Sequence, residues 1–136
     1  NVEKIVRKKI DDYDLGEQTR IFGFSKNLSE FFEISDLLVF ATHLNAAGRP
    51  VFEAAFHKVP ALVACNSPMD DTMVHRVSGL IIPTPNPELI ANQVESLVND
   101  NDLLRKIQAG AFELANRNFN IEVNAKEVIE LYKDIC

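Results

Sequence analysis

The sequence predicts an α/β protein built as a three-layer α/β/α arrangement around a Rossmann-like parallel sheet. Two observations lead to this prediction. Apolar segments of strand length alternate along the chain with segments whose apolar residues recur at helical spacing. The strand-like segments are apolar throughout instead of alternating, which is typical of parallel strands buried on both faces. We therefore expect one α/β domain across residues 1–136.

The first half of the chain is divided into elements by helical periodicity and turn residues. Apolar residues between 2 and 13 predict a helix, and Gly16 is placed to end it. Residues 20–24 are predicted to form a short strand, and residues 28–35 a short helix. Residues 37–41 then form a continuous apolar run, which predicts a strand buried on both faces.

The second half continues the alternation. Pro50 suits the first residue of a helix, because its missing N–H would be unpaired there, and this helix should end before Pro60. Residues 61–65 and 79–82 are predicted to be the next buried strands. Three helices with apolar stripes follow, marked by Ile90, Val94 and Leu97, by Leu103, Ile107 and Leu114, and by Ile121, Val128 and Tyr132.

Composition and charge exclude several classes of protein. The 136 residues are 46% hydrophobic and 25% charged, as in an ordinary folded domain. The net charge of −6 argues against a nucleic-acid-binding protein. Cys65 and Cys136 lie far apart and lack metal-ligand spacing, so the sequence predicts neither a zinc site nor a disulfide framework. No apolar run reaches the roughly 18 residues that span a bilayer, and we expect a cytoplasmic protein.

A ligand of a parallel sheet binds beyond the carboxyl ends of its strands, and one segment there is informative. Residues 42–50 lead from a strand through Gly48 to a helix start, where backbone N–H groups and the helix dipole suit a diphosphate. Gly48 would let a ligand approach the backbone, and Glu53 could accept hydrogen bonds from a ribose diol. A glycine before a helix is common, so a purely structural helix start remains the alternative.

Other candidate residues have simpler interpretations. We interpret Arg49 as a clamp for phosphate in preference to an ordinary surface arginine. Asp70 and Asp71 are adjacent carboxylates that point apart, which favours helix capping over a metal pair, and no metal site is predicted. The histidines are expected to be solvated or structural, and four phenylalanines are expected in the core. These residues are His43, His57 and His75, and Phe22, Phe31, Phe32 and Phe40.

The order of these segments resembles the GT-B retaining glycosyltransferases of the family-four type, the glycosyl transferases group 1. In that family, a strand preceded by an acidic residue leads to Glu, seven residues and a second Glu, followed by a Gly-x-Pro turn and another apolar strand. The resemblance extends over nearly the whole chain from Leu15 onward. The segments that carry it are residues 35–42, 48–55, 58–64, 78–83 and 86–91, with Phe119, Leu131 and Tyr132 near the end.

The resemblance implies roles for individual residues in binding a nucleotide-sugar donor. Glu53 matches the second Glu, which binds the donor ribose. Gly23 and Phe24 match the strand end that borders the nucleobase, and Thr42 matches a small hydroxyl residue beneath the site. The segment implied to hold the diphosphate and face the sugar consists of Gly48, Arg49 and the N–H of Val51.

The chain also departs from the family pattern. Asn45 replaces the first Glu, so it can hydrogen-bond sugar hydroxyls but cannot carry the negative charge expected of a catalytic residue there. Ser67 and Pro68 stand where the family often has glycines. The family's first two strands and its N-terminal acceptor domain have no counterpart, so we expect a C-terminal, donor-binding fragment. The strand at residues 20–24 would then lack a neighbour.

The function implied by the resemblance is transfer of a sugar, of hexosyltransferase type and with retention, from a nucleotide-sugar to a glycan, lipid or other acceptor. The nucleotide-sugar is a substrate, and no cofactor is expected. The parent enzyme would use the N-terminal domain as its partner, work in polysaccharide biosynthesis and associate peripherally with the cytoplasmic face of a membrane. Alternatives are a non-catalytic α/β binding module or a GT-B-related sugar-nucleotide epimerase.

Overall fold

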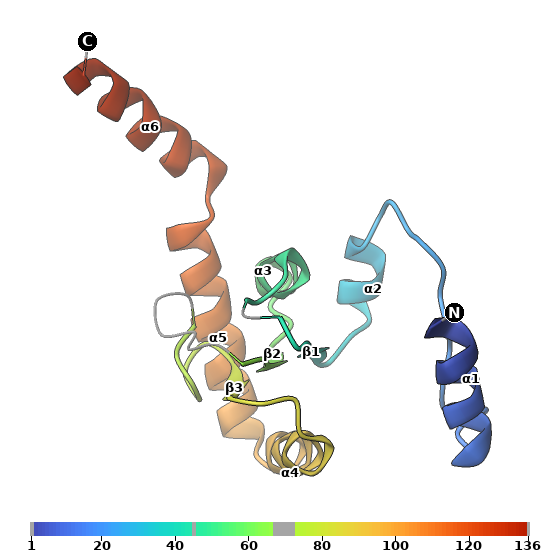
Figure 1. The fold of residues 1–136 in the computed structure, drawn as a ribbon. Helices are drawn as coiled ribbons and strands as arrows, with labels where there is room; N and C mark the ends of the chain where they lie inside the picture. Colours follow the sequence, from blue (N-terminus) through green and yellow to red (C-terminus); the bar gives the residue numbers. More distant parts are fainter. Residues whose placement is uncertain (1, 45, 67–72, 136) are drawn as a thin grey trace.

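The computed structural model describes residues 2–44, 46–66 and 73–135, and within them it confirms the α/β class (Figure 1). The chain begins with two helices and then alternates between a central sheet and the helices around it. The elements in order are α1 (Val2–Asp12), α2 (Ser29–Glu33), β1 (Leu38–Ala41), α3 (Arg49–Phe56), β2 (Ala61–Ala64), β3 (Leu80–Ile82), α4 (Pro87–Val98), α5 (Asn101–Asn118) and α6 (Ile121–Ile135).

Over the part of the chain that the structure describes, the sheet consists of three parallel strands in the order β1-β2-β3. Leu38 of β1 lies opposite Ala61 of β2, and Leu62 of β2 lies opposite Leu80 of β3. The central strand β2 is buried throughout, as its uniformly apolar sequence predicted. The same prediction for residues 37–41 is wrong, because Val39 on the edge strand β1 is 45% exposed. On that face of the sheet, α4 packs against β2 and β3.

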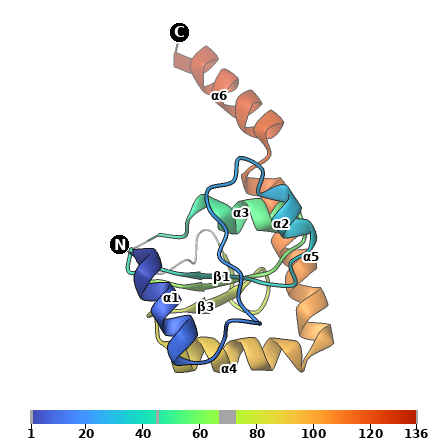
Figure 2. The ribbon, with the colours of Figure 1, turned by 90° about the vertical axis from the view of Figure 1, so that its right-hand side faces the viewer.

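Helices cover both faces of the sheet (Figure 2). On one face, α3 contributes Val51 to a cluster with Ala61 and Val63 of β2. On the other face, Leu62 and Leu80 pack with residues of α4 and α5, including Ile107. The long helix α5 contacts both α4 and α3, and therefore joins the two layers. Burial of large side chains such as these stabilises the fold by roughly 1.5–3 kcal/mol each.

The predicted strand at residues 20–24 is not formed, and the backbone there is irregular. Phe22 is exposed to solvent, which corrects its predicted place in the core, while Phe32 is buried and Phe31 and Phe40 are half-buried. Phe22 instead packs edge-on against Phe31 at a ring-centroid distance of 4.9 Å. A strand is stabilised by hydrogen bonds to a neighbour, and within the described residues the sheet contains β1, β2 and β3 alone.

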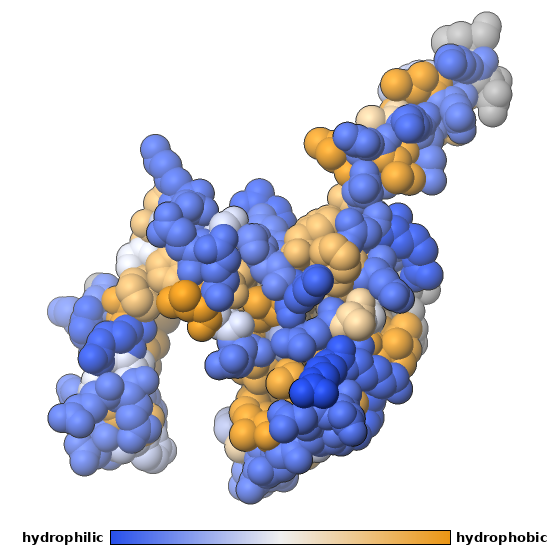
Figure 3. Space-filling view, turned by 180° about the vertical axis from the view of Figure 1, so that it is seen from behind, coloured by the Kyte–Doolittle hydropathy of each residue, from blue (hydrophilic) through white to orange (hydrophobic). Residues whose placement is uncertain are grey.

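The two terminal helices project from this body. The N-terminal helix α1 buries none of its residues, and a hollow separates it from the sheet (Figure 3). The C-terminal helix α6 extends away from α5, so its apolar stripe, including Ile121 and Tyr132, is exposed. None of the helices in the described ranges is long and apolar enough to cross a membrane.

Candidate functional site

A cavity of about 750 Å³ lies between α3 on one side and α2 with its preceding loop on the other. This volume is within the range of roughly 300–1,000 Å³ typical of small-molecule sites. One face of α3 supplies Arg49, Glu53 and Phe56, which are spaced four and three residues apart. The opposite wall is the loop from Gly23 to Ser29 with Phe32 of α2. The cavity is therefore formed by segments that are distant in sequence.

Four of the predicted site residues line this cavity together: Gly23, Phe24, Arg49 and Glu53. The loop that presents the first two is held by its own hydrogen bonds. The Ser25 hydroxyl donates to the Asn27 carbonyl at 2.9 Å, and the Asn27 side chain donates to Glu30 at 2.8 Å. The structure thus brings the predicted nucleobase and ribose segments to one cavity.

Arg49 and Glu53, the two charged residues predicted for the site, are in direct contact. Arg49 Nε lies 2.9 Å from Glu53 Oε1, an ion pair one helical turn apart. The Arg49 side chain is 85% exposed and that of Glu53 is 35% exposed. Glu53 is therefore partly enclosed by the cavity wall while its cationic partner stands at the rim.

The start of α3 differs in detail from the prediction. The helix begins at Arg49, one residue before Pro50, with the extended residue Gly48 as its N-cap. The Val51 N–H, predicted to be open to a diphosphate, donates to the Gly48 carbonyl at 3.0 Å. A ligand could use this amide only by sharing or displacing that bond. Pro50 has no N–H, so the outermost amides of this turn belong to Gly48 and Arg49.

Gly48 also has a structural reason to be glycine. A Cβ atom built on this residue would lie 2.7 Å from Cζ of Phe40, so any larger residue would displace that ring. We predicted that a ligand would approach the backbone closely at Gly48. In the structure, the Phe40 ring of β1 already takes the space next to this glycine. The predicted hydroxyl residue, Thr42, fixes the turn after β1, since its Oγ1 accepts a hydrogen bond from the Leu44 N–H at 3.0 Å.

Several predictions concern residues outside the described ranges. These are Asn45, Ser67, Pro68, Asp70 and Asp71, so the catalytic role of Asn45 stays a prediction. Among the residues that are described, no group of three or more His, Cys, Asp or Glu side chains is arranged to hold a metal ion. His43 is exposed, as expected, and His75 accepts a hydrogen bond from the Ile81 N–H at 3.0 Å.

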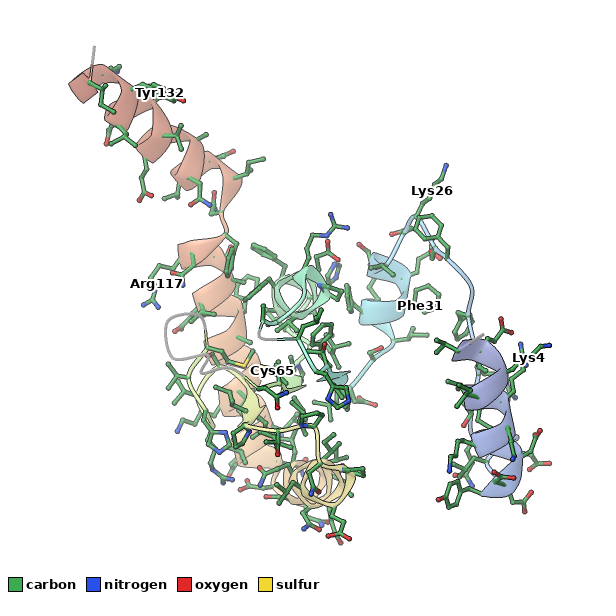
Figure 4. The ribbon with its side chains drawn as sticks, in the orientation of Figure 1. Lys4, Lys26, Phe31, Cys65, Arg117 and Tyr132 are labelled. Carbon is green, nitrogen blue, oxygen red and sulfur yellow. The ribbon has the colours of Figure 1, made fainter. Side chains whose placement is uncertain are left out.

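Sequence reasoning assigned no site role to the other residues of the cavity, among them Lys26, Phe56 and His57. Phe56 follows Glu53 by three positions, so helical spacing alone could have placed it on the same face. His57 lines the cavity beside Phe32, with their ring centroids 5.5 Å apart. Lys26 lies at the tip of the loop and its amine points away from the body (Figure 4), which leaves Arg49 as the cation next to Glu53.

Comparison with known proteins identifies the family of the chain. The family model of the glycosyl transferases group 1 matches residues 1–114 of the chain. The chain belongs to this family. A curated relative, the capsular polysaccharide biosynthesis glycosyltransferase CapM of Staphylococcus aureus, is 26% identical over 102 residues, which cover 75% of the chain and 27% of CapM. The chain therefore spans about a quarter of the length of this relative.

Solved structures show the same fold. The chain superimposes on Anabaena HepE in complex with UDP with a TM-score of 0.88 at 18% identity, covering 96% of the chain and 36% of HepE. A glycosyltransferase from Rickettsia africae gives a TM-score of 0.84 at 24% identity, covering 98% of the chain and 36% of that protein. The C-terminal domain of LpcC from Francisella tularensis gives a TM-score of 0.75 at 20% identity, covering 88% of the chain and 63% of that protein. The predicted GT-B architecture, present here as a partial C-terminal half, is thus confirmed.

Proposed function

We propose that this chain is the donor-binding part of a glycosyltransferase and that a nucleoside diphosphate-sugar binds across the cavity and the start of α3. The observation that supports this most directly is the position of Glu53, whose partly enclosed carboxylate faces a cavity next to the N-terminus of its own helix. A carboxylate there can accept hydrogen bonds from both hydroxyls of a ribose. HepE, which shares the fold, was crystallised with UDP and with UDP-glucose.

The helix start supplies the complementary charge for the diphosphate. The outermost amides, those of Gly48 and Arg49, lie at the positive end of the α3 dipole. The base would then lie toward Gly23 and Phe24 on the opposite wall, and Thr42 would support the turn beneath the phosphates. This placement orders base, ribose and diphosphate along one line of the molecule.

The finer features of the reaction belong to the same proposal. We propose transfer of a hexosyl group with retention, for which the parent enzyme would supply an acceptor-binding domain and Asn45 would contact the sugar. In the parent enzyme, charge on the leaving diphosphate would be stabilised by fixed backbone amides and by cations. The chain of 136 residues should therefore bind the donor nucleotide and transfer no sugar on its own.

Titration of the chain with UDP, GDP and ADP, followed by protein-detected NMR, tests the proposal. We expect one of them to bind and to shift resonances of the 23–29 loop and α3. Glu53→Ala should raise its Kd by roughly 10- to 100-fold, because a hydrogen bond to a charged group contributes about 1.5–3 kcal/mol. Glu3→Ala on α1 is the matched control, since this carboxylate also pairs with an arginine four residues away.

Two outcomes would overturn the proposal. If no nucleoside diphosphate binds, the chain is better described as a non-catalytic α/β module. If one binds but Glu53→Ala and Glu3→Ala behave alike, the assignment of Glu53 to the ribose is wrong. The epimerase alternative makes a different prediction for the parent enzyme, which would then invert a sugar centre without any acceptor. The fold comparisons and family membership give no support to either alternative.

A further inference from the structure

We propose that the side chain of Arg49 is a positioning residue for Glu53 and that it does not bind the diphosphate. This inference rests on the proposed function, because it assigns Glu53 to the ribose. The starting observation is the 2.9 Å contact between Arg49 Nε and Glu53 Oε1. It differs from our sequence-based interpretation of Arg49 as a phosphate clamp. The carboxylate holds the guanidinium at Nε and so fixes its direction, and only the Nη groups stay available to another ligand.

Helix stability does not explain this ion pair. Arg49 is the first residue of α3, where the positive end of the helix dipole disfavours a cation. The order of the pair is also the less favourable one, since an acidic residue stabilises a helix more when it precedes its basic partner by four positions. The first turn of α3 contains no acidic residue that would offset this. Local departures from helix rules of this kind are typical of functional sites.

A second Arg–Glu pair in the same chain provides the comparison. On α1, Glu3 precedes Arg7 by four positions, so the pair has the favourable order, and its atoms Oε1 and Nη2 are 2.7 Å apart. Both of its side chains are more than half exposed. The cavity lined by Glu53 and Arg49 involves neither of them. The favourable order thus occurs in a pair whose two side chains are both more than half exposed, and the unfavourable order occurs where the carboxylate is partly enclosed at the proposed donor site.

The contact has a direct consequence for ligand binding. A carboxylate offers about four lone-pair sites, so one contact at Oε1 leaves acceptors for the two hydroxyls of a ribose. Holding Glu53 in one rotamer before the ligand arrives removes an ordering cost from the binding step. Arg49 therefore acts on the ligand through Glu53, and the ribose diol is the part of the ligand that should sense its loss.

The test compares a nucleoside diphosphate with its analogue lacking the diol. The probe is whichever of UDP, GDP and ADP binds the wild-type chain most tightly, together with its 2′,3′-dideoxy form, which keeps both phosphates. We expect Arg49→Ala to raise the Kd of the complete nucleotide by roughly three- to tenfold, in line with losing one well-placed hydrogen bond. The Kd of the dideoxy form should not change. Arg49→Lys should recover part of the affinity, because an ammonium can still reach Oε1.

Two controls separate this role from simpler ones. In a Glu53→Ala background, Arg49→Ala should have no further effect, because the group that it positions is gone. Arg7→Ala, which breaks the pair on α1, should leave both Kd values unchanged. Since the Arg49 side chain is 85% exposed, its removal should not alter the melting temperature enough to account for weaker binding.

The possible results distinguish this inference from the proposed function. If Arg49→Ala weakens the complete and dideoxy nucleotides equally, and still does so without Glu53, Arg49 is a phosphate ligand and the positioning role is wrong, while the donor site stands. If the wild-type chain binds none of the three nucleotides, the donor site and the positioning role fail together. If Arg49→Ala changes neither Kd, Glu53 needs no positioning and the inference alone is overturned.

Discussion

Helices α1 and α5 are both amphipathic, yet their apolar residues have opposite environments. Ile107 of α5 is 0% exposed and packs against Leu62 and Leu80 of the sheet. Ile5 of α1 is 64% exposed, and α1 has no buried residue at all. The difference shows that apolar periodicity predicts a helix and its apolar face, whereas burial of that face depends on a partner surface elsewhere in the chain.

The largest expected effect is on the free energy of unfolding, which should fall when α5 loses an apolar side chain and hardly change when α1 does. Ile107→Ala should lower the free energy of unfolding by about 2–5 kcal/mol, because it removes buried methyl groups and leaves a cavity beneath the sheet. Ile5→Ala, the same change on α1, should lower it by less than about 0.5 kcal/mol. Chemical denaturation followed by circular dichroism measures both values. Equal losses would show that α1 is buried in solution and would break the comparison.

Glycines in the two regions should respond differently to alanine. In an exposed helix, Gly→Ala stabilises by up to about 1 kcal/mol. Gly110 of α5 is different, since an added Cβ would overlap the carbonyl oxygen of Val77. We expect Gly110→Ala to cost roughly 1–3 kcal/mol, as overpacking against a backbone atom does.

The control for this prediction is Gly16, after α1, where an added Cβ would meet nothing within 4 Å. Gly16→Ala should therefore leave stability nearly unchanged. The melting temperatures of both variants, measured by calorimetry, provide the test. A Gly110→Ala variant that melts at or above the wild-type temperature would contradict the close packing of α5 on the segment around Val77.

The sheet could be predicted from sequence because each strand is encoded locally. The segments 37–41, 61–65 and 79–82 were predicted from apolar runs, and the strands occur within one residue of these limits. The exposed Val39 shows that the local sequence predicts a strand but does not predict whether both of its faces are buried. Whether an edge strand is covered depends on helices that arrive from another part of the chain, and on one face α4 packs against β2 and β3. The irregular backbone at residues 20–24 has the same cause, since a strand requires a neighbour.

The candidate site was predictable where its residues follow directly from a strand or a helix start. Glu53 and Arg49 were placed by the helix that begins beyond β1, and Gly23 and Phe24 by the resemblance to the family. The placement of the 23–29 loop across the cavity from α3 was not predictable, because it depends on a tertiary contact in which Phe32 of α2 meets His57 at the end of α3. The Arg49–Glu53 pair lay within reach of sequence reasoning, since four-residue spacing brings side chains together on a helix.

The smallest effects compare the ends of these helices. The Asp100 side chain caps α5 by accepting a hydrogen bond from the Leu103 N–H at 2.9 Å, so Asp100→Ala should cost about 1 kcal/mol of stability. On α1, Arg7→Ala removes an exposed ion pair with Glu3, which should cost only about 0.3–0.5 kcal/mol. This loss should shrink further in high salt, because exposed charges are screened, whereas the loss from Asp100→Ala should depend much less on salt. Thermal unfolding of both variants at low and high ionic strength distinguishes a cap in the packed body from a pair on a solvated helix. An equal, salt-sensitive loss in both variants would mean that α5 begins in an environment as open to water as α1.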